Sequence, residues 1–279
     1  MADPFDFERP PRYAVLGNPV AHSKSPRIHA QFAQQLGQRI EYTAIQVDPG
    51  GFAQAVAQFR ANGGLGLNIT VPFKLEARQL AERLSARATL AGAVNTLRFE
   101  ADGALYGDNT DGVGLVRDIT VNLGVALAGK NILLLGAGGA ARGVLGPLLE
   151  QKPAHLTIAN RTVPKAKELA EIFAALGEVE GVGYETLAGR RFDCVINATA
   201  ASLRDEVPPL PDDLFAPGAL AYDLMYSDAL TAFLRWAEAH GAGKLADGLG
   251  MLVEQAAESF FIWRGVRPDT APVIAALRS

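Results

Sequence analysis

Apolar and polar positions along the 279-residue chain form two series in which short apolar runs alternate with amphipathic stretches. Runs that are rich in β-branched residues and bounded by glycine or proline are typical of strands, and apolar residues spaced three and four apart are typical of helices. The first series predicts strands at residues 13–17, 41–47 and 65–71, a hairpin of strands 94–99 and 104–106, and helices at 27–36, 52–60 and 113–123. The second predicts strands at 131–135, 155–159, 193–197 and 219–224, and helices at 140–150, 165–175, 231–239 and 251–263.

Turn residues punctuate these elements. Asn18-Pro19 closes the first strand, Ser25 and Pro26 stand where an N-cap and a first helical residue are expected, and Asp102-Gly103 is typical of a hairpin turn. Strands separated by helices predict parallel sheets with right-handed crossovers. We therefore expect an α/β protein of two domains. One comprises residues 1–110 together with 247–279, because the last long helix is expected to return to the first domain, and the other comprises residues 111–246.

Composition and charge exclude several classes of partner. Hydrophobic residues make up 49% and charged residues 20%, which is ordinary for a globular protein. A net charge of −4 gives no electrostatic reason to expect nucleic acid or an anionic membrane surface as a partner. No apolar run reaches the roughly 18 residues that a membrane helix needs. Residues 1–6 lack the basic start and apolar core of a signal peptide, so we expect a cytoplasmic protein.

The single cysteine and the histidines carry no separate chemistry in this interpretation. Cys194 lies in an apolar run, so we expect it in the core rather than as a reactive thiol, and one cysteine alone forms no internal disulfide. The four histidines are scattered without metal-ligand spacing, and no metal site is expected. The sequence leaves a monomer and a homodimer open.

A glycine-rich turn connects the strand at residues 131–135 to the helix that follows it. It reads Gly136-Ala137-Gly138-Gly139-Ala140-Ala141, the G-x-G-x-x-A form of the dinucleotide-binding fingerprint. The first glycine permits the tight turn, the second lets the backbone approach a pyrophosphate, and the small last residue lets helix and strand pack. Backbone N–H groups and the helix dipole then favour phosphate. The turn therefore predicts a doubly wound Rossmann-type domain, a bound dinucleotide and redox chemistry.

The tip of the next strand selects the cofactor. Domains that bind NAD carry a carboxylate there, about 20 residues after the glycine turn, to hold the ribose hydroxyl. Here the tip reads Asn160-Arg161-Thr162, without a carboxylate. Arg161 offers a planar fork of donors to a 2′-phosphate, and Lys165 adds charge. NADP is therefore the predicted cofactor.

Four polar motifs of the first series are candidate site residues, and open α/β sheets bind their ligands at the carboxyl ends of strands. Ser23 and Ser25 stand at a helix N-terminus, where hydroxyl groups and the dipole can hold a carboxylate, although Ser25 could equally serve only as the N-cap. Lys74 comes directly after the strand at residues 65–71. The other two motifs are residues 91–96 and 107–112, and in the second of these Asp111 is either a helix cap or a site residue.

Taken together, these motifs resemble those of the shikimate dehydrogenase family, whose members reduce 3-dehydroshikimate to shikimate. The matching stretches keep the family's order and span the chain almost end to end: residues 17–26, 68–74, 92–96, 107–112, 136–141, 160–162 and 247–256. The resemblance implies an N-terminal α/β substrate domain beside a Rossmann-type NADP-binding domain. It also implies a reversible, NADPH-dependent reduction in chorismate and aromatic amino-acid biosynthesis.

The same resemblance implies a role for individual residues. Lys74 and Asp111 would be the catalytic pair; burial favours a neutral Lys74 and the carboxylate favours an ammonium, and the sequence does not decide between them. The substrate would be bound by Ser23, Ser25, Thr70, Lys74, Asn95, Asp111, Tyr226 and Gln255. NADP would be bound by Gly136, Ala137, Gly138, Gly139, Ala140, Ala141, Asn160, Arg161, Thr162, Lys165, Thr199 and Gly248.

Two local departures and two other functions stay open. After Thr199 the family usually has serine, any residue and glycine, whereas this chain has Ala200-Ala201-Ser202; we expect a more restricted backbone and one hydroxyl donor fewer. Asp228 stands where the family often has proline, which predicts a local change of turn. The alternative functions are a quinate or dual quinate/shikimate dehydrogenase, and a regulator that binds NADP without turnover. The presence of both Lys74 and Asp111 argues against the regulator.

Overall fold

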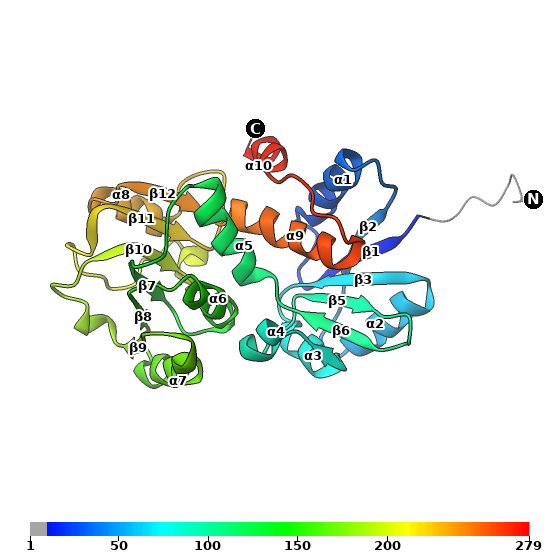
Figure 1. The fold of residues 1–279 in the computed structure, drawn as a ribbon, viewed down its shortest axis with the longest axis horizontal. Helices are drawn as coiled ribbons and strands as arrows, with labels where there is room; N and C mark the ends of the chain where they lie inside the picture. The colour runs from blue at the N-terminus through cyan, green and yellow to red at the C-terminus, as the bar shows by residue number, and fades with distance from the viewer. Residues whose placement is uncertain (1–9, 279) are drawn as a thin grey trace, which may run out of the picture.

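Two lobes lie side by side in the computed structural model, each built on a six-stranded sheet, with helices α5 (Asp111–Arg117) and α9 (Leu249–Arg264) between them (Figure 1). The structure describes residues 10–278, so the prediction about a signal peptide, which rests on residues 1–6, lies outside the described residues. Both sheets are covered by helices, and the predicted α/β fold is confirmed.

The first sheet has the order β2-β1-β3-β5-β6-β4. Its first three strands are parallel, and β5 runs antiparallel to both β3 and β6, which confirms the predicted hairpin. The hairpin connection is longer than Asp102-Gly103 alone, because the amide of Glu100 donates to the carbonyl of Ala104 and closes the loop there. The strands are β1 (Arg12–Gly17), β2 (Glu41–Gln46), β3 (Gly64–Ile69), β4 (Arg83–Leu84), β5 (Thr96–Phe99) and β6 (Leu105–Asp108).

Four helices accompany this sheet: α1 (Ser25–Gln35), α2 (Phe52–Ala61), α3 (Lys74–Leu80) and α4 (Ala86–Ala91). The N-cap of α1 is Lys24, and Ser25 is the first helical residue, so the prediction of Ser25 as the N-cap is wrong by one position. The backbone N–H of Ser25 is instead satisfied by the hydroxyl of Ser23, 3.3 Å away. Helices α3 and α4 and strand β4 were not predicted.

The second sheet is parallel throughout, in the order β12-β11-β10-β7-β8-β9. Counted from its own first strand this is the doubly wound Rossmann order, so the predicted fold of this lobe is confirmed. The strands are β7 (Asn131–Leu135), β8 (His155–Ala159), β9 (Val179–Val182), β10 (Phe192–Asn197), β11 (Phe215–Asp223) and β12 (Lys244–Asp247). Its helices are α6 (Gly139–Glu150), α7 (Val163–Phe173) and α8 (Ala232–Ala239).

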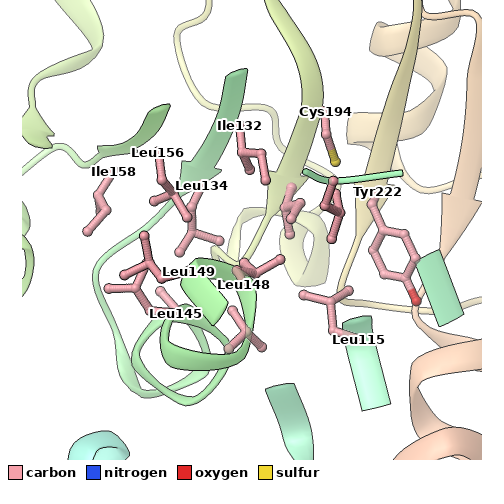
Figure 2. Close-up of a cluster of buried hydrophobic side chains, with 14 of the residues drawn as sticks. Leu115, Ile132, Leu134, Leu145, Leu148, Leu149, Leu156, Ile158, Cys194 and Tyr222 are labelled. Carbon is pink, nitrogen blue, oxygen red and sulfur yellow. The ribbon is translucent and has the colours of Figure 1, made fainter. Parts of the chain in front are cut away.

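The largest core of the second lobe lies between this sheet and α6 (Figure 2). Leu145 and Leu148 of α6 pack with Ile132 of β7 and Ile158 of β8, and all four side chains are fully buried. Each such side chain contributes about 1.5–3 kcal/mol relative to an exposed one. Cys194 lies in the same core, and burial raises the pKa of its thiol to about 12. The prediction of a structural rather than a reactive cysteine is confirmed.

The segment between the lobes packs through unusually close helix contacts. A Cβ at Gly112 of α5 would lie 2.7 Å from the carbonyl oxygen of Gly143 in α6, and a Cβ at Gly114 would lie 2.8 Å from the backbone nitrogen of Gln255 in α9. Only glycine permits this approach. After α5 the chain forms a π-helical turn, Asp118–Asn122, so the helix predicted at residues 113–123 is divided in two.

The last two helices pack against the first lobe. Val253 and Phe260 of α9 share a buried cluster with Ile28 and Phe32 of α1 and with Val273 of α10 (Ala271–Arg278). This packing agrees with the expected return of the chain to its first domain. The domain boundaries at residues 110 and 247 stay predictions.

Candidate functional site

A pocket of about 300 Å³ opens at the carboxyl ends of β1 and β3 and is bounded on its other side by α9. All predicted substrate-binding residues except Asp111 line it: Ser23, Ser25, Thr70, Lys74, Asn95, Tyr226 and Gln255. Residues that lie more than two hundred positions apart in the sequence therefore meet at one place, as the resemblance implied.

The two loops of the pocket are brought together by strand pairing. Leu16 of β1 lies opposite Ile69 of β3, so the loops that follow the two strands begin side by side at the same edge of the sheet. A Cβ at Gly17 would lie 2.3 Å from Cγ2 of Thr70, so a larger residue would push the two loops apart. The amide of Asn18 also donates to the carbonyl of Val71 at 2.9 Å, which fixes the loops to each other.

Lys24 joins the first lobe to the loop that follows β11. Its ammonium lies 5.8 Å from the centre of the Tyr226 ring, within the range of a cation–π contact. Burial raises the pKa of Tyr226, and the negative charge of Asp247 raises it further. Lys24 lines the pocket but was not among the predicted site residues; its position between Ser23 and Ser25 was the available signal.

Lys74 and Asp111 form an ion pair at the floor of the pocket. Lys74 is the first residue of α3, Asp111 is the first residue of α5, and the distance from Nζ to Oδ2 is 2.6 Å. The lysine side chain is 31% exposed and the aspartate 8%, so the carboxylate lies behind the ammonium group that lines the pocket. The positive end of the α5 dipole also favours a carboxylate at this position.

Asn95 connects the ion pair to α9. Its buried Nδ2 donates to Oδ1 of Asp111 at 2.8 Å and to Oε1 of Gln255 at 2.9 Å. Its Oδ1 accepts the backbone N–H of Thr110 at 2.9 Å. Thr110, not Asp111, is the N-cap of α5, so the interpretation of Asp111 as a helix cap is wrong, and its carboxylate serves Lys74 and Asn95 instead.

Asn68, which lines the pocket, is held from behind by Tyr42 and Ser259, two residues that the sequence analysis missed. Asn68 donates to Oγ of Ser259 at 2.9 Å and accepts from the hydroxyl of Tyr42 at 2.7 Å. Ser259 also lies 2.8 Å from the hydroxyl of Thr96. Ser259 follows Gln255 by four positions in α9, so the helical spacing places both on one face, and that spacing was the signal available for Ser259. Nothing local in the sequence identified Tyr42.

The predicted cofactor residues gather at the carboxyl edge of the second sheet. Leu135 lies opposite both Ala159 and Asn197, so the loops after β7, β8 and β10 emerge side by side. Gly136 has φ +103°, and a Cβ there would lie 3.2 Å from Cγ2 of Thr199. The glycine turn, the tip at Asn160 and the Thr199 loop therefore adjoin, at the point where the strand order reverses and α/β sheets bind dinucleotides.

The glycine turn fits a pyrophosphate. A Cβ at Gly138 or Gly139 would meet nothing within 4 Å, so open space lies in front of the α6 N-terminus. The first N–H groups of a helix have no partner within the helix and can bind an anion there. Ala141, the last small residue of the fingerprint, is fully buried in the core that α6 shares with the sheet.

The residues beyond the next strand are exposed and carry positive charge. Arg161, Thr162 and Lys165 are all exposed, and Asn160 turns its amide onto the carbonyl of Thr162 at 2.9 Å. Burial raises the pKa of Tyr184, and the nearby Arg161 acts in the opposite direction. This arrangement leaves the guanidinium available to a phosphate in solution.

Gly248 and the loop after Thr199 are the remaining parts of the predicted cofactor site. A Cβ at Gly248 would lie 2.1 Å from the carbonyl oxygen of Leu224, so only glycine fits at this crossing into α9. Ser202, which stands where the family usually has glycine, lies within the 3₁₀ turn Ala201–Arg204 and does not have a positive φ. The conformation of this loop does not require the glycine that the family usually has, and the left-handed residue that ends the turn is Asp205, at φ 55°.

The described part of the chain offers neither a metal site nor a membrane-spanning helix. Among residues 10–278, no three histidine, cysteine, aspartate or glutamate side chains lie close enough together to hold a metal ion. Within the same residues, no helix is both long enough and apolar enough to cross a membrane.

Three family models match the chain: the shikimate dehydrogenase substrate-binding domain at residues 15–97, shikimate/quinate 5-dehydrogenase at 119–204, and the shikimate 5′-dehydrogenase C-terminal domain at 248–278. A shikimate dehydrogenase (NADP(+)) of Nitrosospira multiformis is 62% identical over 267 residues, which are 96% of this chain and 97% of that protein. One of Alkalilimnicola ehrlichii is 61% identical, over 96% of this chain and 98% of that protein. The shikimate 5-dehydrogenase of Thermus thermophilus, solved with NADP(H) and shikimate, has a TM-score of 0.85 and 36% identity, over 96% of this chain and 98% of that one.

Proposed function

Because this chain belongs to the shikimate dehydrogenase family, we propose that it catalyses the reversible, NADPH-dependent reduction of 3-dehydroshikimate to shikimate, a step towards chorismate and the aromatic amino acids. It is an NADP-dependent oxidoreductase. The observation that carries the choice of substrate is the Lys74–Asp111 ion pair at the floor of a pocket whose rim holds Ser23 and Ser25.

The pocket offers a separate group for each polar part of such a substrate. The hydroxyls of Ser23 and Ser25, beside the Lys24 ammonium at the start of α1, suit a carboxylate. Thr70, Asn95, Gln255 and Tyr226 line the remaining wall and suit the ring hydroxyls. Hydrogen bonds of this kind discriminate strongly, because an analogue without the hydroxyl leaves a buried polar group unpaired.

Lys74 is the proposed proton donor. NADPH, when bound, supplies the hydride. The Lys74 ammonium stabilises the negative charge that develops on the ketone oxygen and gives that oxygen its proton. Asp111 holds the ammonium in place at 2.6 Å, and Asn95 in turn holds Asp111. In the reverse direction, the neutral lysine takes the proton of the substrate hydroxyl.

The proposed cofactor residues divide by the part of NADP that each would hold. The α6 N-terminus, from Gly136 to Ala141, suits the pyrophosphate, and Thr199 adjoins that turn. Asn160, Arg161, Thr162 and Lys165 suit the 2′-phosphate side, where Arg161 supplies planar, bidentate donors. Gly248 lies at the crossing from β12 into α9, and we propose that it adjoins the nicotinamide.

We also propose the division into a substrate domain, residues 1–110 with 247–279, and an NADP domain, residues 111–246. Tyr226 then comes from the NADP domain although it lines the pocket, which supports a site formed between the two domains. A monomeric or homodimeric state and a cytoplasmic location stay predictions from the sequence.

Turnover assays with four substrate and cofactor combinations test the proposal. Absorbance of reduced nicotinamide is followed with shikimate or quinate and with NADP or NAD. We expect the highest kcat/KM for shikimate with NADP. Arg161→Ala should lower the preference for NADP over NAD by about tenfold. This corresponds to the loss of about 1.4 kcal/mol of charge-assisted hydrogen bonding to the 2′-phosphate. Lys167→Ala removes an exposed cation of α7, the helix that begins just after Arg161; it is the matched control and should keep the preference.

The same assays decide against the proposal if quinate is the better substrate, or if no combination is turned over. Equal turnover with NAD and NADP, unchanged in Arg161→Ala, would remove the role of Arg161 without affecting the choice of shikimate.

A further inference from the structure

A fully buried carboxylate lies in the second lobe, beside the loop that follows β10. Asp223 ends β11, and its exposed fraction is zero. Oδ2 accepts the hydroxyls of Ser202 at 2.7 Å and Thr231 at 2.6 Å, and Oδ1 accepts the backbone N–H of Met225 at 3.1 Å. The Asn197 amide lies 3.3 Å from Oδ1. A buried charge is retained only when hydrogen bonds or ion pairs compensate it, so these donors hold the carboxylate and are held by it.

Asn197 passes this constraint to the loop beside the glycine turn. Its Oδ1 accepts both the backbone N–H of Thr199, at 3.1 Å, and the Thr199 hydroxyl, at 2.7 Å. Its Nδ2 donates to Oγ of Ser202 at 3.1 Å. The orientation of the Asn197 amide is therefore set by Ser202 and Asp223 on its nitrogen side, and that orientation fixes Thr199 on its oxygen side.

The hydroxyl of Ser202 consequently faces inward. It bridges Asn197 and Asp223, and it returns the loop after β10 to the end of β11. The family usually carries its loop hydroxyl two positions earlier, where this chain has Ala200. In this chain the Ser202 side chain holds the loop from its inner side. Thr199 is then the hydroxyl residue of the loop that lies next to the glycine turn.

We propose that Ser202, acting through Asn197 and Asp223, is a positioning residue that holds the Thr199 loop in the conformation that binds NADP. This inference rests on the proposed function, since it assumes that the Thr199 loop contacts NADP. The Ser202 hydroxyl is engaged by Asn197 and Asp223, so its effect on the cofactor is exerted through them. Its removal takes one donor from a buried carboxylate and one acceptor from Asn197, and the loop loses its attachment to β11.

Thr231 offers a matched control. It donates to the same oxygen of Asp223 as Ser202 does, but it lies at the N-terminus of α8, where its hydroxyl also accepts the amide of Leu234. Thr231→Val therefore removes an equivalent bond to Asp223 and a helix cap, without touching the Thr199 loop. If Ser202 served stability alone, Thr231→Val would have the same effect as Ser202→Ala or a larger one.

The test is isothermal titration of NADPH into the wild-type chain, Ser202→Ala, Ser202→Thr and Thr231→Val, with thermal melting of each. Loss of one hydrogen bond predicts that Ser202→Ala raises the Kd for NADPH about three- to tenfold. Ser202→Thr keeps the hydroxyl and should restore the Kd to within about twofold of wild type, as should Thr231→Val, although Thr231→Val should melt at the lowest temperature.

A Kd for Ser202→Ala within about twofold of wild type overturns the inference, as does an equal rise in Thr231→Val. Failure of the proposed function is distinguishable from this. A wild-type chain that binds NADPH but does not reduce 3-dehydroshikimate loses the proposed function, and the binding series still decides the role of Ser202. A wild-type chain that does not bind NADPH overturns both.

Discussion

In the pocket, side chains hold other side chains, whereas at the glycine turn the backbone faces open space. Asn95 donates to both Asp111 and Gln255, so these polar groups are already paired with one another. Gly138 and Gly139, by contrast, have no atoms within 4 Å of the position that a Cβ would occupy. One region is a preorganised network of side chains, and the other is a cradle of N–H groups.

This difference separates the kinds of change that each region tolerates. In a preorganised network each group is held by its neighbours, so removing one disturbs the geometry on which the chemistry depends. A backbone cradle has few side chains to lose, and its affinity depends on the space in front of it. Substitutions in the pocket should therefore appear mainly in kcat, and substitutions at the turn mainly in the affinity for the cofactor.

The largest effect is expected from Lys74→Ala. Loss of the proton donor should lower kcat about 100- to 10,000-fold, the usual contribution of general acid catalysis. The KM should change less. Lys24→Ala, which removes a second ammonium from the same pocket, is the control and should raise KM for shikimate with a much smaller change in kcat. Steady-state kinetics of both variants would contradict the comparison if Lys74→Ala kept the wild-type kcat.

A pair of glycine substitutions should show the same contrast in stability. A Cβ at Gly112 would lie 2.6 Å from Cγ of Pro147, so Gly112→Ala should destabilise the fold by about 1–3 kcal/mol through overpacking. Gly138 has φ −90° and open space around it, so Gly138→Ala should leave the free energy of unfolding unchanged and weaken NADPH binding. Urea unfolding and NADPH titration of both variants provide the check; equal stability of the two would show that the packing of α5 on α6 is not tight.

The two regions also differed in how far the sequence predicted them. The glycine turn was identified correctly because all its determinants lie within a few residues: a buried strand, the glycines and an apolar helix. Most central strands were predicted for the same reason. The edge strand β9 was missed because its four residues, Val179–Val182, are only half-buried and include Glu180 and Gly181. Short elements such as β4 and α4 carry too few residues to show a period.

The pocket was predicted only through the resemblance, because its contacts depend on tertiary structure. No spacing in the sequence places Lys74 against Asp111. The approach depends on Val94 and Asn95, whose amides donate to the carbonyls of Lys74 and Asp108 and so bring the starts of α3 and α5 together. Ser202 shows the same limit. Its role depends on β10 lying next to β11, with Asn197 opposite Asp223, and a loop sequence that departs from the family pattern gave no indication of an inward hydroxyl.

The smallest predicted effect concerns acid stability, and it too should distinguish the two regions. His29 lies in the first lobe behind the pocket, fully buried and stacked on Tyr42 with ring centres 4.1 Å apart. Burial lowers the pKa of His29 from its ordinary 6.5 to about 3, and the side chain of Asn68 opposes this shift only in part. The side chains of Phe32, Phe260 and Trp263 also surround the imidazole, and these uncharged rings do not stabilise its protonated form.

Between pH 6.5 and 3 the unfolded chain binds a proton at His29 that the folded chain does not bind, so folding stability falls as the pH falls through this window. One unit below the unfolded pKa the loss from this group is about 1.4 kcal/mol. His29→Gln should flatten the dependence of the free energy of unfolding on pH between 7 and 5.5, whatever its effect on stability at pH 7. His22→Gln, a substitution of an exposed histidine, should leave the slope unchanged. Urea unfolding at several pH values measures both slopes. If His29→Gln still lost stability steeply in acid, a group other than His29 would be responsible.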